Sequence, residues 1–195
     1  MVAIRASSGN SGFTLIELMV TLAVLAILAA IAAPSFADII DKFRLRGAVD
    51  DVISVIANAR AESVKSGLDV RVDFAGTTAA WCVAANPAIV PTAGERIDSA
   101  ADCDCSAGTC VAMPGENLLS VPVGSHAGVT VTGATVGKAF TFNSKLGVVS
   151  PLVTHAVTLI SPAGKYFLAA TVNPLGQASV CVPIGKPLIA GVSSC

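Results

Sequence analysis

Residues 13–33 read FTLIELMVTLAVLAILAAIAA, and Glu17 is the one charged side chain among them. At the rise of an α-helix this stretch would cover roughly 30 Å, the thickness of the hydrocarbon layer of a membrane. The alternative is a cleaved secretory signal peptide, because Ala30-Ile31-Ala32 imitates a cleavage site and Arg5 supplies a weakly positive start. The apolar core of a signal peptide is only about 7–15 residues long. The length therefore favours a membrane helix that the protein keeps.

Glu17 is out of place in such a helix. A carboxylate inside a membrane costs at least ~2.5–3.5 kcal/mol on insertion scales, so it normally has a partner or marks a path. No basic residue lies within two helical turns of it. If the chain were cut after Gly12, the new amino group of Phe13 would lie one turn away, and that of a neighbouring subunit could pair with Glu17. We therefore expect Glu17 to fix the register between subunits, the plainer alternative being a neutralised acid that faces lipid.

The composition fits a chain that is partly in contact with something other than water. Of the 195 residues, 53% are hydrophobic, which is more than in an ordinary globular protein, and 13% are charged, which is fewer. The length suits one domain with a short extra element. Since 13 acidic residues face 12 basic ones, electrostatics predict no nucleic-acid partner and no attraction to anionic membranes.

The helix is expected to continue from residue 34 to residue 67 with a bend at Pro34, which cannot donate the helical hydrogen bond. Gly67 predicts its end. Apolar residues recur there at helical spacing and should pack on the chain's own sheet, an intermolecular coiled coil being the disfavoured alternative because heptads are absent. They are Phe36, Ile39, Ile40, Phe43, Val49, Val52, Ile53, Ile56 and Val64.

Downstream of residue 68 the sequence predicts antiparallel strands. Alternating runs occupy residues 68–74, 80–85, 128–133, 138–143, 155–160 and 165–171. Residues 143–147 and 161–164 have the composition of turns. Residues 86–124 have little periodicity and are interpreted as a surface loop held by cysteines.

All six cysteines lie after the apolar segment, which indicates an oxidising compartment for this part of the chain. The candidates for disulfides are Cys82, Cys103, Cys105, Cys110, Cys181 and Cys195. A zinc site is disfavoured because the spacing of the middle three lacks paired C-x-x-C knuckles and histidines. Cys181 and Cys195 could close a loop of about fourteen residues, although other pairings stay open.

The sequence predicts no catalytic residue, no metal and no cofactor. His126 and His155 lie in apolar or strand-like surroundings without a nucleophile or acid nearby in the sequence. Asp102 and Asp104 lack the ligand spacing of a calcium loop and are interpreted as solvated.

Residues 12–18, GFTLIEL, resemble the class III signal of type IV pilins and type II secretion pseudopilins. The resemblance implies that a prepilin peptidase cuts between Gly12 and Phe13, that Phe13 is N-methylated, and that Glu17 registers the next subunit. Residues 1–12 would then be the leader peptide, although Arg5 is its one basic residue, where the family often has more.

Residues 140–147 (FTFNSKLG) and 176–181 (GQASVC), after a long helix, resemble the minor subunits grouped as GspH/FimT. In the DNA-uptake branch of that family, the closing strand resembles the pattern Gly-Arg-x-Arg-x-Cys. This chain has Gln177 and Ser179 at the positions of the two arginines. Without those two arginines, phosphate neutralisation is weak, although Lys165 and Lys186 lie nearby in the sequence. A DNA-binding minor pilin is thus the disfavoured alternative.

The combined expectation is an α+β pilin-like protein with a leader at 1–12, a transmembrane and filament-core helix at 13–33, an amphipathic continuation at 34–67 and a periplasmic β-rich domain at 68–195. It would cross the bacterial inner membrane once and then enter a pilus or pseudopilus filament. The implied partners are other pilin or pseudopilin subunits, the prepilin peptidase, the inner-membrane assembly platform and membrane lipid. Which of the two machines uses it does not follow from the sequence.

Overall fold

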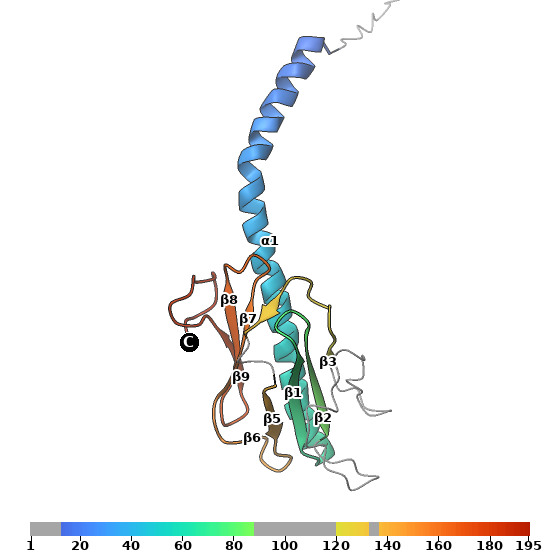
Figure 1. Cartoon of the computed structure of the whole chain (residues 1–195), viewed down its shortest axis with the longest axis vertical. Coiled ribbons are helices and arrows are strands. Elements are labelled where there is room, and N and C mark those ends of the chain that lie inside the picture. The colour runs from blue at the N-terminus through green and yellow to red at the C-terminus, as the bar shows by residue number, and fades with distance from the viewer. Residues whose placement is uncertain (1–12, 88–119, 133–136) are drawn as a thin grey trace, which may run out of the picture. The chain divides into compact units, whose positions relative to one another are not determined.

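The computed structural model describes residues 13–87, 120–132 and 137–195 (Figure 1). The chain forms two compact units, Met1–Ile39 and Ile40–Cys195. Among the described residues, the first unit consists of Phe13, Thr14 and the first part of one helix, whereas the second combines helix and sheet.

Helix α1, Leu15–Ser66, is 52 residues long and runs through Pro34 without a break in its assignment. It starts at Thr14, whose Oγ1 accepts a hydrogen bond from the backbone N–H of Glu17 at 3.3 Å, as an N-cap does. It ends at Gly67, which has φ of 71° and donates its N–H to the carbonyl of Ser63. The predicted end at Gly67 is therefore confirmed, and the bend at Pro34 stays a prediction.

Besides the helix, the described part of the second unit contains two antiparallel sheets. One has the order β3-β2-β1-β5-β6, from β1 (Val70–Gly76), β2 (Trp81–Pro87), β3 (Ser120–Val121), β5 (Ala139–Phe142) and β6 (Val149–Ser150). The other has the order β4-β7-β8-β9, from β4 (Thr130–Val131), β7 (His155–Ile160), β8 (Phe167–Val172) and β9 (Ala178–Cys181). The six predicted strands correspond to β1, β2, β4, β5, β7 and β8, of which β7 has the predicted bounds and the others have shifted ends.

The turn predictions are also confirmed. Residues 143–147 connect β5 to β6, with Gly147 N–H bonded to the carbonyl of Asn143 at 2.8 Å. Residues 161–164 connect β7 to β8, with Gly164 N–H bonded to the carbonyl of Ser161 at 2.8 Å. The two-residue strands β3 and β6 were not predicted because, unlike the equally short β4, they do not lie in a longer alternating run. Most of the predicted loop, 88–119, lies outside the described residues.

One hydrophobic core joins the second part of α1 to both sheets. Leu45, Val52 and Ile56 from the helix are at most 1% exposed, as are Phe142 from the first sheet and Leu159 from the second. The α+β pilin-like architecture is thereby established: a long N-terminal helix packed on a C-terminal antiparallel β domain.

The predicted buried face of the helix was partly wrong. Val49, Val52 and Ile56 are buried, as expected, and Ile53 is half-buried. The remaining predicted members are exposed: Phe36, Ile39, Ile40, Phe43 and Val64. The buried stripe instead follows Asp41, Leu45, Ala48, Val49, Val52, Val55, Ile56, Ala59 and Ser63. Leu45 and Val55 in this stripe are apolar and were overlooked, whereas its small and polar members give no apolar signal.

Candidate functional site

The first unit presents apolar side chains on every side of its helix. Every residue from 13 to 37 is exposed, including Phe13 at 80% and Leu25 at 64%. Among the described residues, one helix, α1, has the length and apolar composition needed to cross a membrane. A helix that is apolar all round is suited to lipid or to a bundle of similar helices.

Glu17 lies in the first turn of α1. An acid there is favourable for the helix itself, because the free N–H groups and the macrodipole give the helix start a partial positive charge. Its side chain is exposed, and its carboxylate has no partner within residues 13–87, 120–132 and 137–195. Phe13 lies just before the helix, and Gly12 lies outside the described residues. The structure thus presents an acid that is available to a cation from another chain.

The closing strand positions singled out in the sequence are occupied by polar, uncharged groups. Gln177 donates its backbone N–H to Asn173 Oδ1 at 2.9 Å and accepts at Oε1 from Asn173 Nδ2 at 3.0 Å. Ser179 Oγ lies 2.8 Å from Thr171 Oγ1. Both side chains are thus used within the β8–β9 hairpin, and neither adds positive charge to it.

The cysteines include a disulfide between Cys181 and Cys195, with a sequence separation of 14. It ties the end of β9 to the last residue of the chain, where Cys195 N–H also donates to the carbonyl of Val182 at 2.9 Å. Cys82 is disulfide-bonded as well. Cys103, Cys105 and Cys110 lie outside the described residues.

The two histidines make contacts of a structural kind. His126 Nε2 lies 2.9 Å from Asp51 Oδ2, and its ring stacks on Trp81 with centroids 6.1 Å apart. His155 lies against Phe140, with centroids 4.9 Å apart. Over the part of the chain that is described, no three His, Cys, Asp or Glu side chains gather in a way that could hold a metal ion. Asp102 and Asp104 are not among these residues.

An all-round apolar N-terminal helix that continues onto a two-sheet β domain defines a pilin-like subunit. Comparison with family models supports this class: residues 7–33 match the prokaryotic N-terminal methylation motif. Residues 48–176 match the type II transport protein GspH, so the chain belongs to the GspH family. Searches of curated proteins and of solved structures found no significant match.

This membership fits a pseudopilin or minor pilin role in type II secretion or in type IV pili. The GspH family is one of structural, non-enzymatic subunits. Membership also suggests processing by a prepilin peptidase and assembly with other pilin or pseudopilin subunits. The apolar helix and the motif fit an anchor in the inner membrane.

Proposed function

We propose that this protein is made as an inner-membrane precursor, trimmed between Gly12 and Phe13, N-methylated at Phe13 and drawn into a pilus or pseudopilus filament. Its role there is structural. The leader would be residues 1–12, the anchor and filament core residues 13–33, the continuation residues 34–67 with a bend at Pro34, and the periplasmic domain residues 68–195.

The observation that carries the proposal is an exposed apolar helix with, in its first turn, a Glu17 carboxylate that has no partner among the described residues. The exposed side chains suit lipid before assembly and neighbouring helices after it. Trimming would create an amino group at Phe13 that Glu17 of an adjacent subunit can bind. Within hydrocarbon, that pair relieves a cost of about 2.5–3.5 kcal/mol, so the paired register is favoured over others.

The periplasmic placement of the second unit is supported by its disulfides, since such bonds persist in oxidising compartments. An inner-membrane platform is the expected partner that extracts the subunit, because a 21-residue apolar segment does not leave a bilayer unaided. Membrane lipid is its partner before that step.

DNA binding remains the disfavoured alternative. Sequence-independent affinity for DNA comes mostly from Lys and Arg contacts to phosphates. Gln177 and Ser179 are engaged with Asn173 and Thr171 in their own hairpin. Lys186 Nζ lies 4.0 Å from the centroid of the Phe167 ring, which is a plain structural use of that cation.

The leader prediction is tested by Gly12→Ala, with Gly9→Ala as the matched control for the same change elsewhere in residues 1–12. Intact mass of the membrane-extracted protein should show the untrimmed chain for Gly12→Ala and the trimmed, methylated chain for Gly9→Ala. Normal trimming of the Gly12→Ala variant would contradict the proposed maturation.

The register prediction is tested separately by Glu17→Gln, which keeps the shape of the side chain and removes its charge. We expect trimming to be unaffected and the amount recovered in sheared or purified filaments to fall by roughly tenfold or more, a free-energy loss of about 1.4 kcal/mol. Unchanged recovery in filaments would refute the role of Glu17.

A further inference from the structure

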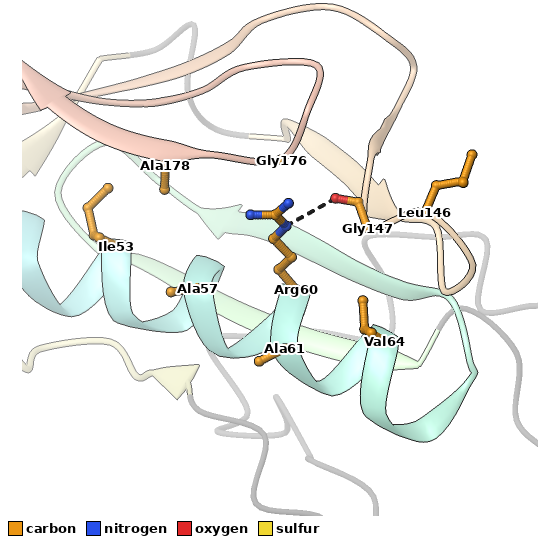
Figure 2. Close-up of a pocket in the computed structure, with 9 residues that line it drawn as sticks. All are labelled: Ile53, Ala57, Arg60, Ala61, Val64, Leu146, Gly147, Gly176 and Ala178. Atoms are coloured by element: carbon orange, nitrogen blue, oxygen red, sulfur yellow. Dashed lines mark hydrogen bonds between the residues drawn. The ribbon is translucent and has the colours of Figure 1, made fainter.

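A groove in the second unit lies between α1 and two neighbouring turns (Figure 2). Its volume of about 470 Å³ is within the range of pockets that hold ligands. One wall is helical and the other is formed by the β5–β6 turn, the β8–β9 turn and the start of β9. The lining residues are Ile53, Ala57, Arg60, Ala61, Val64, Leu146, Gly147, Gly176 and Ala178.

Arg60 is the single charged side chain among these lining residues. It is half-buried, and its Nε donates to the carbonyl of Gly147 at 3.1 Å, as the dashed line in Figure 2 shows. Its Nη1 and Nη2 have no partner in the part of the chain that the structure describes. Because Arg60 lines the groove and is held there at one nitrogen, its remaining donors are available to a bound group.

The turns that form the wall are held by their own hydrogen bonds. Asn143 Oδ1 accepts from the N–H groups of Lys145 and Leu146, at 3.0 and 3.2 Å. Val149 N–H donates to the carbonyl of Pro174 at 3.1 Å, which joins one turn to the other. A pre-formed wall lowers the ordering cost that a bound partner must overcome.

Close approach of the two turns depends on Gly176, which has φ of 78°. A Cβ at this position would collide with the carbonyl oxygen of Gly147 and would lie 3.0 Å from Arg60 Nε. The absence of a side chain lets Arg60 pass between helix and hairpin to reach Gly147. The cation and the groove are consequently parts of one local arrangement.

Two acidic residues near the C-terminal end of α1, Glu62 and Asp69, already have partners within the chain. Glu62 pairs with Lys65 at 3.3 Å, and Asp69 Oδ1 accepts the N–H of Ser144 at 2.7 Å. None of the groove's lining residues is acidic. At its mouth, Leu146 is 75% exposed and Val64 is 57% exposed, so apolar surface extends beyond the hollow itself. The complementary occupant is apolar and carries one negative charge.

We propose that this groove docks an apolar peptide segment of a neighbouring filament subunit, with one acidic side chain of that segment bound to Arg60. The inference rests on the proposed function, which supplies the neighbouring subunit. A carboxylate matches the planar fork of a guanidinium and can accept two hydrogen bonds at once. Burial against Ile53, Val64 and Leu146 adds the affinity that an exposed ion pair alone lacks.

The first test uses the full chain in detergent micelles and the peptide acetyl-Leu-Ala-Glu-Ala-Leu-amide as the probe. We expect saturable shifts of the amide resonances of Gly147, Gly176 and Ala178. The same peptide with Gln in place of Glu should bind roughly tenfold more weakly or worse, because an amide lacks the negative charge and the second acceptor oxygen that pair with a guanidinium. Equal binding of the two peptides would overturn the proposal.

A third peptide distinguishes the source of the carboxylate. The Gln peptide with a free carboxyl terminus carries its charge at the end rather than on a side chain. If this peptide binds and the amidated Glu peptide does not, the groove recognises a chain terminus. The proposal that an acidic side chain binds Arg60 is then wrong. Weaker binding of the free-terminus peptide than of the Glu peptide supports the proposal.

Two variants locate the binding. Arg60→Gln should reduce affinity for the Glu peptide to that of the Gln peptide. Ala57→Leu narrows the groove while keeping the Arg60 guanidinium, and it should weaken the binding of both peptides. Asn58→Leu is the matched control, since Asn58 is exposed on the same turn and does not line the groove. Unchanged affinity in Ala57→Leu would contradict docking in this groove even if Arg60→Gln failed to fold.

These binding measurements are independent of leader trimming and filament recovery. Failure of the peptides to bind would sink the groove inference and leave the Gly12 and Glu17 results standing. Normal trimming in Gly12→Ala would sink the proposed maturation and leave peptide affinity unchanged.

Discussion

The two parts of α1 treat the same kind of side chain in opposite ways. Leu25 in the first unit is 64% exposed, whereas Leu45 in the second is fully buried. The first part is apolar all round, so no single face could be buried by one sheet. The second part confines its buried residues to one stripe that faces both sheets. Apolar residues thus form the folded core in the second part, and under the proposed function they serve assembly in the first.

The largest expected effect comes from the same truncation made in each part. Leu45→Ala removes buried contacts and should lower the free energy of unfolding of the second unit by about 3–5 kcal/mol. Leu25→Ala should leave it unchanged, because Leu25 is not part of the core. Urea unfolding of the full chain in micelles, followed by tryptophan fluorescence of Trp81, measures both. Equal destabilisation by the two variants would abolish the contrast.

The next largest effect concerns the disulfide of the second unit, which has no counterpart among the described residues of the first. Cys195→Ser opens the loop closed by Cys181–Cys195 and should lower stability by about 3 kcal/mol in the chain-entropy account. The same urea titration, done without reductant, gives the answer. Ser194→Ala is the control, since it changes the neighbouring residue and keeps the bond. An unfolding midpoint equal to that of the unchanged protein would show that the disulfide adds nothing.

A smaller effect is expected where two turns meet. Gly176→Ala and Gly185→Ala both place a side chain at positive φ, which costs roughly 1–2 kcal/mol. Gly185 has open space around its missing Cβ, whereas Gly176 faces the carbonyl of Gly147. Gly176→Ala should therefore destabilise the second unit by more than Gly185→Ala in thermal unfolding. A larger loss in the Gly185 variant would contradict the described contact of the turns.

The smallest effect concerns the helix start in the first unit. Thr14→Ala removes the cap that accepts the Glu17 N–H and should cost about 1 kcal/mol locally. Hydrogen exchange of the Glu17 amide in micelles should become faster by roughly fivefold, with unfolding of the second unit unaffected. Thr21→Ala, in the helix interior, serves as the comparison. Slower or unchanged exchange in Thr14→Ala would show that Thr14 is not the cap.

Much of the fold follows from local pattern. The helix end at Gly67 could be predicted because glycine accepts positive φ without strain. The 143–147 and 161–164 turns could be predicted because their residues are typical of turns. The strands other than β3, β6 and β9 could be predicted because each lies in a strand-like run of at least six residues. The short strands β3 and β6 could not, since they exist only through pairing with β2 and β5.

Phe36 and Phe43 were predicted to be buried and are exposed, for a different reason. Both continue the apolar spacing, and sequence pattern cannot tell a core partner from a partner outside the chain. Arg60 was also missed. In the sequence, Arg60 is a cation among the apolar residues Ile53, Ala57, Ala61 and Val64 at helical spacing. The groove that it lines is completed by turns more than eighty residues away, which the helix sequence does not reveal.

The central claim is that residues 13–33 hold this subunit among its neighbours in a filament. The direct measurement is in-cell photocrosslinking from a reactive residue placed at Leu25, with Ala79 on the surface of the second unit for comparison, followed by mass spectrometry of the partners. We expect Leu25 to crosslink to pilin-type subunits whenever the machine is assembled, and the identity of those subunits will distinguish a pilus from a secretion pseudopilus. Crosslinks from Leu25 to lipid alone, in cells with assembled filaments, would contradict the account.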